Sequence, residues 1–369
     1  MANPSPKITH SSSPRPDVEI ILADGRVLNG PRGTSVGAFL HTLPEWKKAD
    51  FMGAVVNGEL RELTYPIGKD STVRPLTMRD TDGSRIYRRS VTFLLEAAFD
   101  DLFPEADLAV DHSLSSGAFY CEVVGRSALT PDEVKRLEVH MQELVRADLP
   151  FERQTVPLQQ AVEIFEKKGQ DEKVQLLKYR KKDHLVLYRL GQHQDYHHGY
   201  MVPSTGYLRW FALERMGDGF ALRFPRRQAP NEIQPLPDSK ILLATFRQYG
   251  NWLARLGIES VGALNAAIEA GRIREIILVS EALHELRIAE IARKIVARSN
   301  QARIVLIAGP SSSGKTTFSK RLSVQLLAQG LSPFPLEMDN YFVNREMTPK
   351  DERGDFNFEE KGKRFFSLS

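Results

Sequence analysis

The chain has 369 residues, of which 41% are hydrophobic and 26% are charged, a composition typical of a globular protein with several cores. Its formal net charge of +3, from 50 basic and 47 acidic residues, is too small to indicate nucleic acid or a membrane as partner. No stretch approaches the ~18 apolar residues of a membrane helix. The single cysteine, Cys121, excludes an internal disulfide and, within an apolar run, is expected to be a buried structural thiol.

Residues 1–16 are rich in Ser and Pro and are expected to form a disordered tail. A transit segment for an organelle is the less favoured alternative, because only Lys7 and Arg15 are basic there. We therefore expect a cytoplasmic protein.

Residues 17–78 carry two hairpin signals. β-prone runs flank Asp24-Gly25 and again Asn57-Gly58, dipeptides that suit turns with positive φ. Between them, residues 35–43 show the apolar spacing of a short helix. This pattern predicts a small α+β domain of ubiquitin-like (β-grasp) type.

Residues 79–225 predict a second α+β domain. A helix is expected over 88–103, and another opens at Thr130 with Pro131 at its first position and Glu133 in a capping box. Strands are expected around 178–191 and 206–224, with the basic run 178–182 on the solvent face of a strand. Residues 226–300 predict a linker followed by connecting helices.

A phosphate-binding loop is predicted near residue 310. An apolar run at 304–308 predicts a buried parallel strand, and apolar positions at 318, 322 and 326 predict a helix. Between them the sequence matches G-x-x-x-x-G-K-[ST], whose backbone amides and helix N-terminus bind nucleotide phosphates. The loop consists of Gly309, Pro310, Ser311, Ser312, Ser313, Gly314, Lys315 and Thr316. Lys315 is expected to contact the β- and γ-phosphates, and Thr316 to offer its hydroxyl to Mg²⁺.

Asp339 follows a second predicted strand within residues 333–342. A carboxylate at the carboxyl end of such a strand can act as the base in phosphoryl transfer. Asp-Asn is equally suited to capping a turn, so the residues alone leave both roles open.

Residues 301–369 resemble the start of the uridine kinase/phosphoribulokinase family of P-loop kinases, through GPSSSGKTT, MDNYF and GDFNFE. The resemblance implies an α/β fold, ATP and Mg²⁺ as cofactors, and a nucleoside-like acceptor. It implies that Asp339 and Lys315 are catalytic and that Thr317 extends the ATP site. It also implies that Tyr341 and Phe342 shape the acceptor pocket and that Glu359 contacts the ribose.

The front of the chain resembles the N-terminal region of threonyl-tRNA synthetases, with 17–78 similar to a TGS domain and 79–225 similar to the second additional, editing domain. The matching runs are LTPDEVKRLEVHMQELVRADLPFER and VPSTGYLRWFAL. The family's editing site uses two histidines four apart on a helix, then a Cys and a His. This chain has Arg89, Phe93, His197 and Met201 at those positions. The resemblance therefore implies a retained scaffold without tRNA editing.

The run HQDYHHGY contains His193, Asp195, His197 and His198, which raises the question of a zinc site. Adjacent histidines on a strand point to opposite faces, and no cysteine lies nearby. We expect a solvated or hydrogen-bonded loop instead.

Uridine kinase-like domains need roughly 200 residues, an ordinary domain size, and the pattern does not continue after residue 359. We therefore expect a truncated chain without measurable nucleoside kinase activity. The main hypothesis is an ATP-dependent nucleoside kinase of uridine type. The alternative is a non-catalytic regulatory or RNA-binding protein with a vestigial nucleotide site, although the charge balance does not indicate RNA. A TGS-containing GTPase is disfavoured because no guanine-binding element is visible. The acceptor and the oligomeric state stay open.

Overall fold

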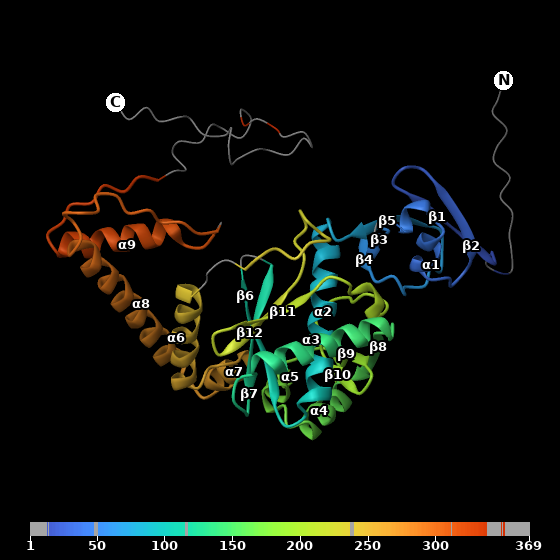
Figure 1. The fold of residues 1–369 in the computed structure, drawn as a ribbon, viewed down its shortest axis with the longest axis horizontal. Coiled ribbons are helices and arrows are strands. Elements are labelled where there is room, and N and C mark those ends of the chain that lie inside the picture. Colours follow the sequence, from blue (N-terminus) through green and yellow to red (C-terminus); the bar gives the residue numbers. More distant parts are fainter. Residues whose placement is uncertain are drawn as a thin grey trace. The chain divides into compact units, whose positions relative to one another are not determined.

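A computed structural model describes residues 13, 15–47, 51–114, 117–236, 240–310, 312–337, 348 and 350. The chain divides into two compact units, Met1–Leu253 and Ala254–Ser369. The described residues form a mixed α+β protein with three sheets, all in the first unit (Figure 1). The domain boundaries predicted from the sequence stay predictions, as do the TGS and P-loop domain assignments.

The first sheet has five strands in the order β2-β1-β5-β3-β4. Its elements are β1 (Asp17–Leu22), β2 (Val27–Pro31), α1 (Val36–His41), the short 3-10 helix η1 (Pro44–Lys47), β3 (Phe51–Val56), β4 (Glu59–Arg61) and β5 (Ser71–Thr77). Both predicted hairpins are confirmed: β1 pairs with β2 and β3 with β4, each antiparallel. Gly25 has φ +86°, and Asn57 and Gly58 have φ +51° and +84°, as tight hairpin turns require.

The second sheet has four strands in the order β11-β12-β7-β6. Around it lie α2 (Thr81–Leu102), β6 (Asp107–Leu114), β7 (Ala118–Val124), α3 (Pro131–Arg146), the 3-10 helix η2 (Thr205–Tyr207), β11 (Ala212–Met216) and β12 (Gly219–Arg223). The capping box of α3 is confirmed, with Thr130 and Glu133 exchanging hydrogen bonds. Helix α2 begins at Thr81 rather than at residue 88. Residues 81–84 are polar and typical of a turn, so the sequence does not indicate a helix there. The burial of Ile86 and Tyr87 stabilises this first turn.

The third sheet has three antiparallel strands in the order β10-β9-β8. Its elements are β8 (Glu152–Pro157), α4 (Leu158–Lys167), α5 (Asp171–Leu177), β9 (His184–Leu190) and β10 (His193–Asp195). The expectation that the basic run 178–182 lies on a strand is wrong. These residues form the turn between α5 and β9, because Arg180 Nε donates to the carbonyl oxygen of His184 and closes the connection.

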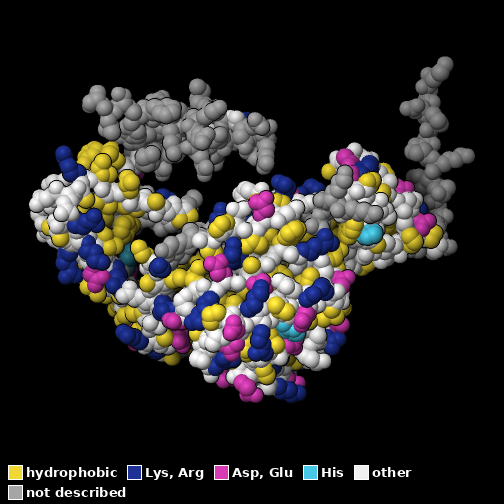
Figure 2. All heavy atoms as spheres, viewed as in Figure 1, with side chains coloured by type: hydrophobic (Ala, Val, Ile, Leu, Met, Phe, Trp, Pro, Cys, Tyr) yellow, Lys and Arg dark blue, Asp and Glu magenta, His cyan; other side chains and the backbone are white. Residues whose placement is uncertain are grey.

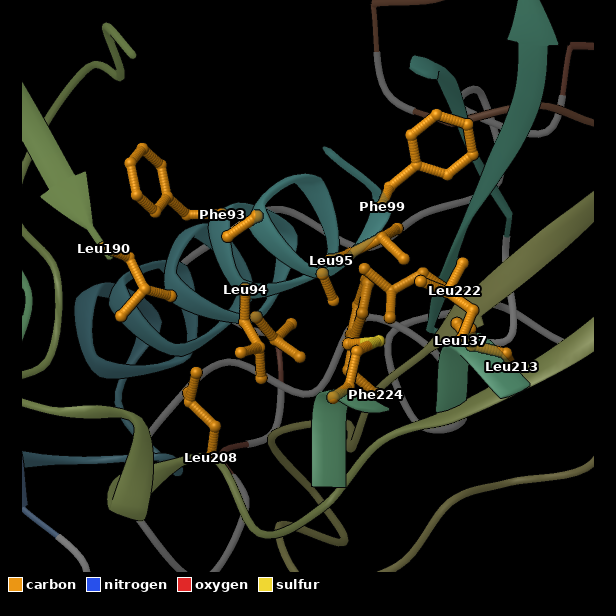
Figure 3. Close-up of a cluster of buried hydrophobic side chains, with 14 of the residues drawn as sticks. Phe93, Leu94, Leu95, Phe99, Leu137, Leu190, Leu208, Leu213, Leu222 and Phe224 are labelled. Carbon is orange, nitrogen blue, oxygen red and sulfur yellow. The ribbon is translucent and has the colours of Figure 1, made fainter. Parts of the chain in front are cut away.

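Helix α2 is the centre of the largest core (Figure 3). Phe93, Leu94, Leu95 and Phe99 have no measurable exposure. They share one core with side chains of α3, the second sheet and β9, and the ring of Phe93 packs on those of Phe151 and Tyr188. Cys121 lies in the same core with 0% exposure. Burial raises the pKa of its thiol, so the expectation of an inert structural cysteine is confirmed.

Helices predominate in the last third of the chain: α6 (Lys240–Leu256), α7 (Val261–Glu269), α8 (Ile273–Val296) and α9 (Lys315–Ala328). In the second unit α8 packs on α9 through Ile288, Ala292, Leu322 and Leu326. Both the connecting helices and the helix after the phosphate loop are therefore confirmed. Across the described ranges, no helix combines the length and apolar character needed to cross a membrane.

The strand expected at 304–308 is wrong. These residues have no regular secondary structure, and Ile304 and Leu306 are 77% and 89% exposed. Residues 333–337, the described part of the second expected strand, are not extended into a sheet either. A parallel strand is stable only between neighbours that accept and donate its backbone hydrogen bonds, and the described part of the second unit contains no strand.

Candidate functional site

The predicted phosphate loop lies directly before α9. Gly314 has φ +80° and precedes the first helical residue, Lys315. A Cβ at Gly309 would lie 2.7 Å from Ser313 Oγ, so a larger residue there would displace the Ser313 hydroxyl. Lys315 Nζ donates to the carbonyl oxygens of Gly309 and Pro310 at 2.9 and 2.8 Å. The Lys315 amine thus contacts the loop that is predicted to bind the phosphates.

The other predicted kinase residues are not brought together by the described structure. Ser311, Asp339, Tyr341, Phe342 and Glu359 lie outside the described residues. Ser312 has φ +60°, and Thr316 and Thr317 lie in the first turn of α9. The structure therefore describes most of the phosphate loop and nothing of the predicted base or acceptor pocket.

The four positions that correspond to the editing site do come together, between α2 and the segment 196–201. Phe93 is fully buried, and its ring centroid lies 5.3 Å from that of His197 and 4.7 Å from that of His193. Met201 is 1% exposed and belongs to the same core. Apolar side chains therefore fill the place where an editing site would hold polar ones.

Arg89 occupies the remaining helix position. Its Nη1 donates to the carbonyl oxygen of Tyr200 at 2.6 Å, and burial lowers the pKa of its guanidinium. Gly199 has φ +96°, and a Cβ there would lie 2.8 Å from Arg89 Cζ. The guanidinium thus holds the 199–201 backbone against α2.

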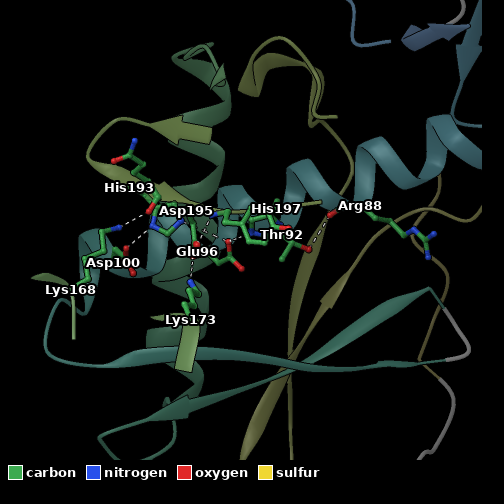
Figure 4. A network of polar contacts seen from close by, with 11 residues as sticks. Arg88, Thr92, Glu96, Asp100, Lys168, Lys173, His193, Asp195 and His197 are labelled. Carbon is green, nitrogen blue, oxygen red and sulfur yellow. Dashed lines mark hydrogen bonds and ion pairs between the residues drawn. The ribbon is translucent and has the colours of Figure 1, made fainter. Parts of the chain in front are cut away.

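A charged network lies one and two turns further along α2 (Figure 4). His197 Nε2 is 2.8 Å from Glu96 Oε2, and His193 Nδ1 is 2.6 Å from Asp100 Oδ2. Burial alone would raise the pKa of Glu96, but His197 and His193 outweigh it and lower the pKa to about 2. Glu96 is therefore a carboxylate at neutral pH, held between two imidazoles.

Two lysines complete the network, one directly after α4 and one in α5. Lys173 Nζ donates to the carboxylate of Asp195, and Lys168 Nζ donates to the carbonyl oxygen of Gln194 at 2.6 Å. His198 has a different partner, the hydroxyl of Tyr196. The expected hydrogen-bonded loop is confirmed for His197 and His198, which have different partners, whereas His193–Asp195 form strand β10 instead.

Sequence reasoning missed Glu96 and Asp100, although a signal was present. Positions 89, 93, 96 and 100 repeat at helical spacing, so these side chains share one face of α2. The face that carries Arg89 and Phe93 therefore also presents two carboxylates to the histidine segment.

A second charged feature of α2 is centred on Arg88, the residue directly before Arg89. Arg88 is half-buried over the ring of Phe224, with Cζ 5.9 Å from its centroid. Within the described residues its Nε is buried without a hydrogen-bond partner. Burial, then the neighbouring charges of Arg85 and Arg227, lower the pKa of Arg88. Arg88 therefore lies in the field of two further guanidiniums, of which Arg85 is also paired with Asp82 at 3.2 Å.

Comparison with known proteins gives a consistent result. No protein-family model matches the chain. The threonine–tRNA ligase of Clostridium kluyveri is 32% identical over 190 residues, covering 51% of this chain and 30% of the relative. That of Desulforamulus reducens is 31% identical over 197 residues (53% and 31%), and that of Symbiobacterium thermophilum is 33% identical over 198 residues (53% and 30%). The chain spans about 30% of the length of these curated relatives.

These relatives support the resemblance of the N-terminal modules to threonyl-tRNA synthetases. They overturn the main functional hypothesis: the relatives are tRNA ligases, which indicates a synthetase-related function rather than a nucleoside kinase of uridine type. The identification of residues 301–369 with the uridine kinase/phosphoribulokinase family likewise gains no support from them. The alternative hypothesis, a protein that acts through its synthetase-like modules, agrees better with these findings.

Proposed function

We propose that the chain is a non-catalytic RNA-binding protein whose synthetase-like residues 79–225 bind a tRNA-type ligand. The names of the relatives provide the class of partner, since each is a threonine–tRNA ligase. The structure supports the absence of hydrolysis at the editing-like position. Ester hydrolysis needs a side chain that can accept a proton or position a water, and neither Phe93 nor Met201 offers one.

The two polar residues at this position are engaged elsewhere. The guanidinium of Arg89 remains protonated and only donates hydrogen bonds, here to a backbone carbonyl. His197 is hydrogen-bonded to Glu96 and packs on Phe93. A charged tRNA bound here would therefore remain charged.

The observation that carries the RNA-binding proposal is the Arg88 cluster. Arg88 is half-buried, and among the described contacts it has no carboxylate partner, while Arg85 and Arg227 stand close enough to lower its pKa. The described ion pairs give Arg85 a carboxylate partner, Asp82 at 3.2 Å, and give none to Arg88 or Arg227, so the cluster keeps a net positive charge that lacks a counterion. A phosphate supplies that counterion and accepts the paired hydrogen bonds that guanidinium donates.

The proposed phosphate contact at the Arg88 cluster is local, because the surface around it is not broadly basic. On the face shown in Figure 2, basic and acidic side chains are interspersed. We therefore expect few phosphate contacts and a shallow salt dependence of binding.

Fluorescence anisotropy of the full chain with a labelled threonine tRNA tests the proposal. Binding should weaken as salt rises from 50 to 200 mM, and Arg88→Gln should weaken it by about 5–10-fold and reduce the salt slope by about one. Arg189→Gln is the matched control, since Arg189 is already paired with Glu152. The proposal fails if the wild-type chain does not bind, if Arg189→Gln is equally harmful, or if the chain deacylates charged tRNA above background.

As a second candidate function, we propose that residues 309–317 bind the phosphates of ATP without transferring one. This is supported by the left-handed Gly314 at the start of the 14-residue α9 and by the position of Lys315 against the loop. The backbone amides of the first turn would hold the phosphates, Lys315 would add its charge, and Thr316 would offer its hydroxyl to Mg²⁺.

Binding of a fluorescent ATP analogue with and without Mg²⁺ tests this site. Lys315→Ala should lower the affinity at least tenfold. Lys320→Ala, an exposed lysine of the same helix, should leave it unchanged. Equal binding by wild type and Lys315→Ala would contradict the proposal.

A further inference from the structure

The charged network contains three potential metal ligands that converge on one point. Glu96 of α2 and His193 and Asp195 of β10 each offer one ligand atom, and these atoms lie within 4.8 Å of one another. Figure 4 shows the three side chains directed toward the same space. Residues far apart in sequence are therefore brought together by the packing of β10 on α2.

His193 is the residue that points to a ligand. Its side chain is 6% exposed, and within the described structure its buried Nε2 has no hydrogen-bond partner. The nearest carboxylate oxygen, Glu96 Oε2, is 3.8 Å away, which is too long for a hydrogen bond. A buried polar nitrogen without a partner is unfavourable, and a bound cation would satisfy it.

The other ring nitrogen of His193 is arranged as in metal-bound histidines. Asp100 accepts a hydrogen bond from Nδ1 at 2.6 Å, which leaves the lone pair of the neutral ring on Nε2, facing Glu96. A carboxylate behind the imidazole fixes its orientation and raises its basicity toward a metal. Asp100 is therefore placed as the supporting residue of a histidine ligand.

We propose that Glu96, His193 and Asp195 bind one divalent transition-metal ion. One imidazole and two carboxylates form a mixed nitrogen and oxygen donor set, which suits Zn²⁺ better than Mg²⁺ or Ca²⁺ with their preference for oxygen alone. His197, which contacts the same Glu96 oxygen, is the candidate fourth ligand.

Both carboxylate oxygens of Asp195 already have hydrogen-bond partners, which a bound metal would have to displace or share. Lys173 holds one oxygen of Asp195, and the backbone amide of Tyr196 donates to the other at 2.6 Å. A bound metal ion would take the place of the Lys173 ammonium at Asp195.

Calorimetric titration of the chelator-treated full chain with ZnCl₂ tests the proposal. One equivalent should bind, raising the midpoint of thermal unfolding, because the ion would join α2 to β10. Cobalt substitution should give visible d–d absorption bands that vanish on addition of zinc. Glu96→Gln and His193→Gln should each weaken zinc binding at least tenfold.

Three further variants keep the test decisive. Asp100→Asn, at a side chain that is 52% exposed, should fold normally and weaken binding about tenfold. Lys173→Met should tighten binding several-fold by removing the competing cation. His198→Gln, at the neighbouring exposed histidine, should change nothing. Absence of a one-equivalent transition in the wild type, or equal loss in His198→Gln, overturns the proposal.

Discussion

Two apolar segments of similar composition, one in each unit, differ completely in burial. Along α2, Phe93, Leu94, Leu95 and Phe99 are completely buried, since α3 and side chains of the second and third sheets share one core with them. Residues 304–308 are as apolar, yet Ile304 and Leu306 are mostly exposed. Helix α2 satisfies its backbone hydrogen bonds internally, whereas a strand depends on neighbours. Hydrophobicity alone therefore does not place a segment in a core.

The largest expected effect is the loss of a core aromatic from α2. Phe99→Ala removes a ring that is fully buried and packs on Phe103 with centroids 5.1 Å apart. We expect the free energy of unfolding of the first unit to fall by about 3–5 kcal/mol. Urea denaturation followed by circular dichroism measures it, and a loss below about 1 kcal/mol would contradict the described packing.

A smaller effect is expected from a buried polar contact of the same unit. The hydroxyl of Tyr188, itself 1% exposed, donates to Glu62 at 2.9 Å. Tyr188→Phe should lower the free energy of unfolding by about 2 kcal/mol, as for hydrogen bonds to charged groups. Tyr249→Phe is the control, because Tyr249 is 54% exposed and its loss should be within error.

The cap of α3 is expected to contribute less again. Thr130→Ala removes the hydroxyl that accepts from the backbone amide of Glu133, and should lower the free energy of unfolding by about 1 kcal/mol. Thr130→Ser keeps the oxygen and should recover most of the stability. If the two variants are equally destabilised, the capping hydrogen bond is not the cause.

The smallest effect should come from the exposed segment of the second unit. Leu306→Ala, at a side chain that is 89% exposed, should change the free energy of unfolding by less than about 0.5 kcal/mol. The amides of 304–308 should also exchange with solvent far faster than those of α2, as measured by hydrogen–deuterium exchange. A loss comparable to that of Phe99→Ala would show that residue 306 is buried after all.

Local chemistry made much of the fold predictable. The hairpins at Asp24-Gly25 and Asn57-Gly58, the capping box at Thr130 and the helix after Gly314 all depend on residues close in sequence. The early start of α2 was missed because its first turn looks like a loop. The strand at 304–308 was expected from composition, but strand formation depends on distant partners.

The candidate sites divide in the same way. From the sequence by itself, the exchange of editing residues at 89, 93, 197 and 201 was readable, as was the phosphate-loop motif. The folded chain alone shows that Phe93 and Met201 are buried in the core, and that Glu96 and His193 lie at one site. The physical reason is that burial and convergence belong to the packing of α2 against β10 and the segment 196–201. Neighbouring residues dictate turns and caps, but charges far apart along the chain are brought together only by a folded core.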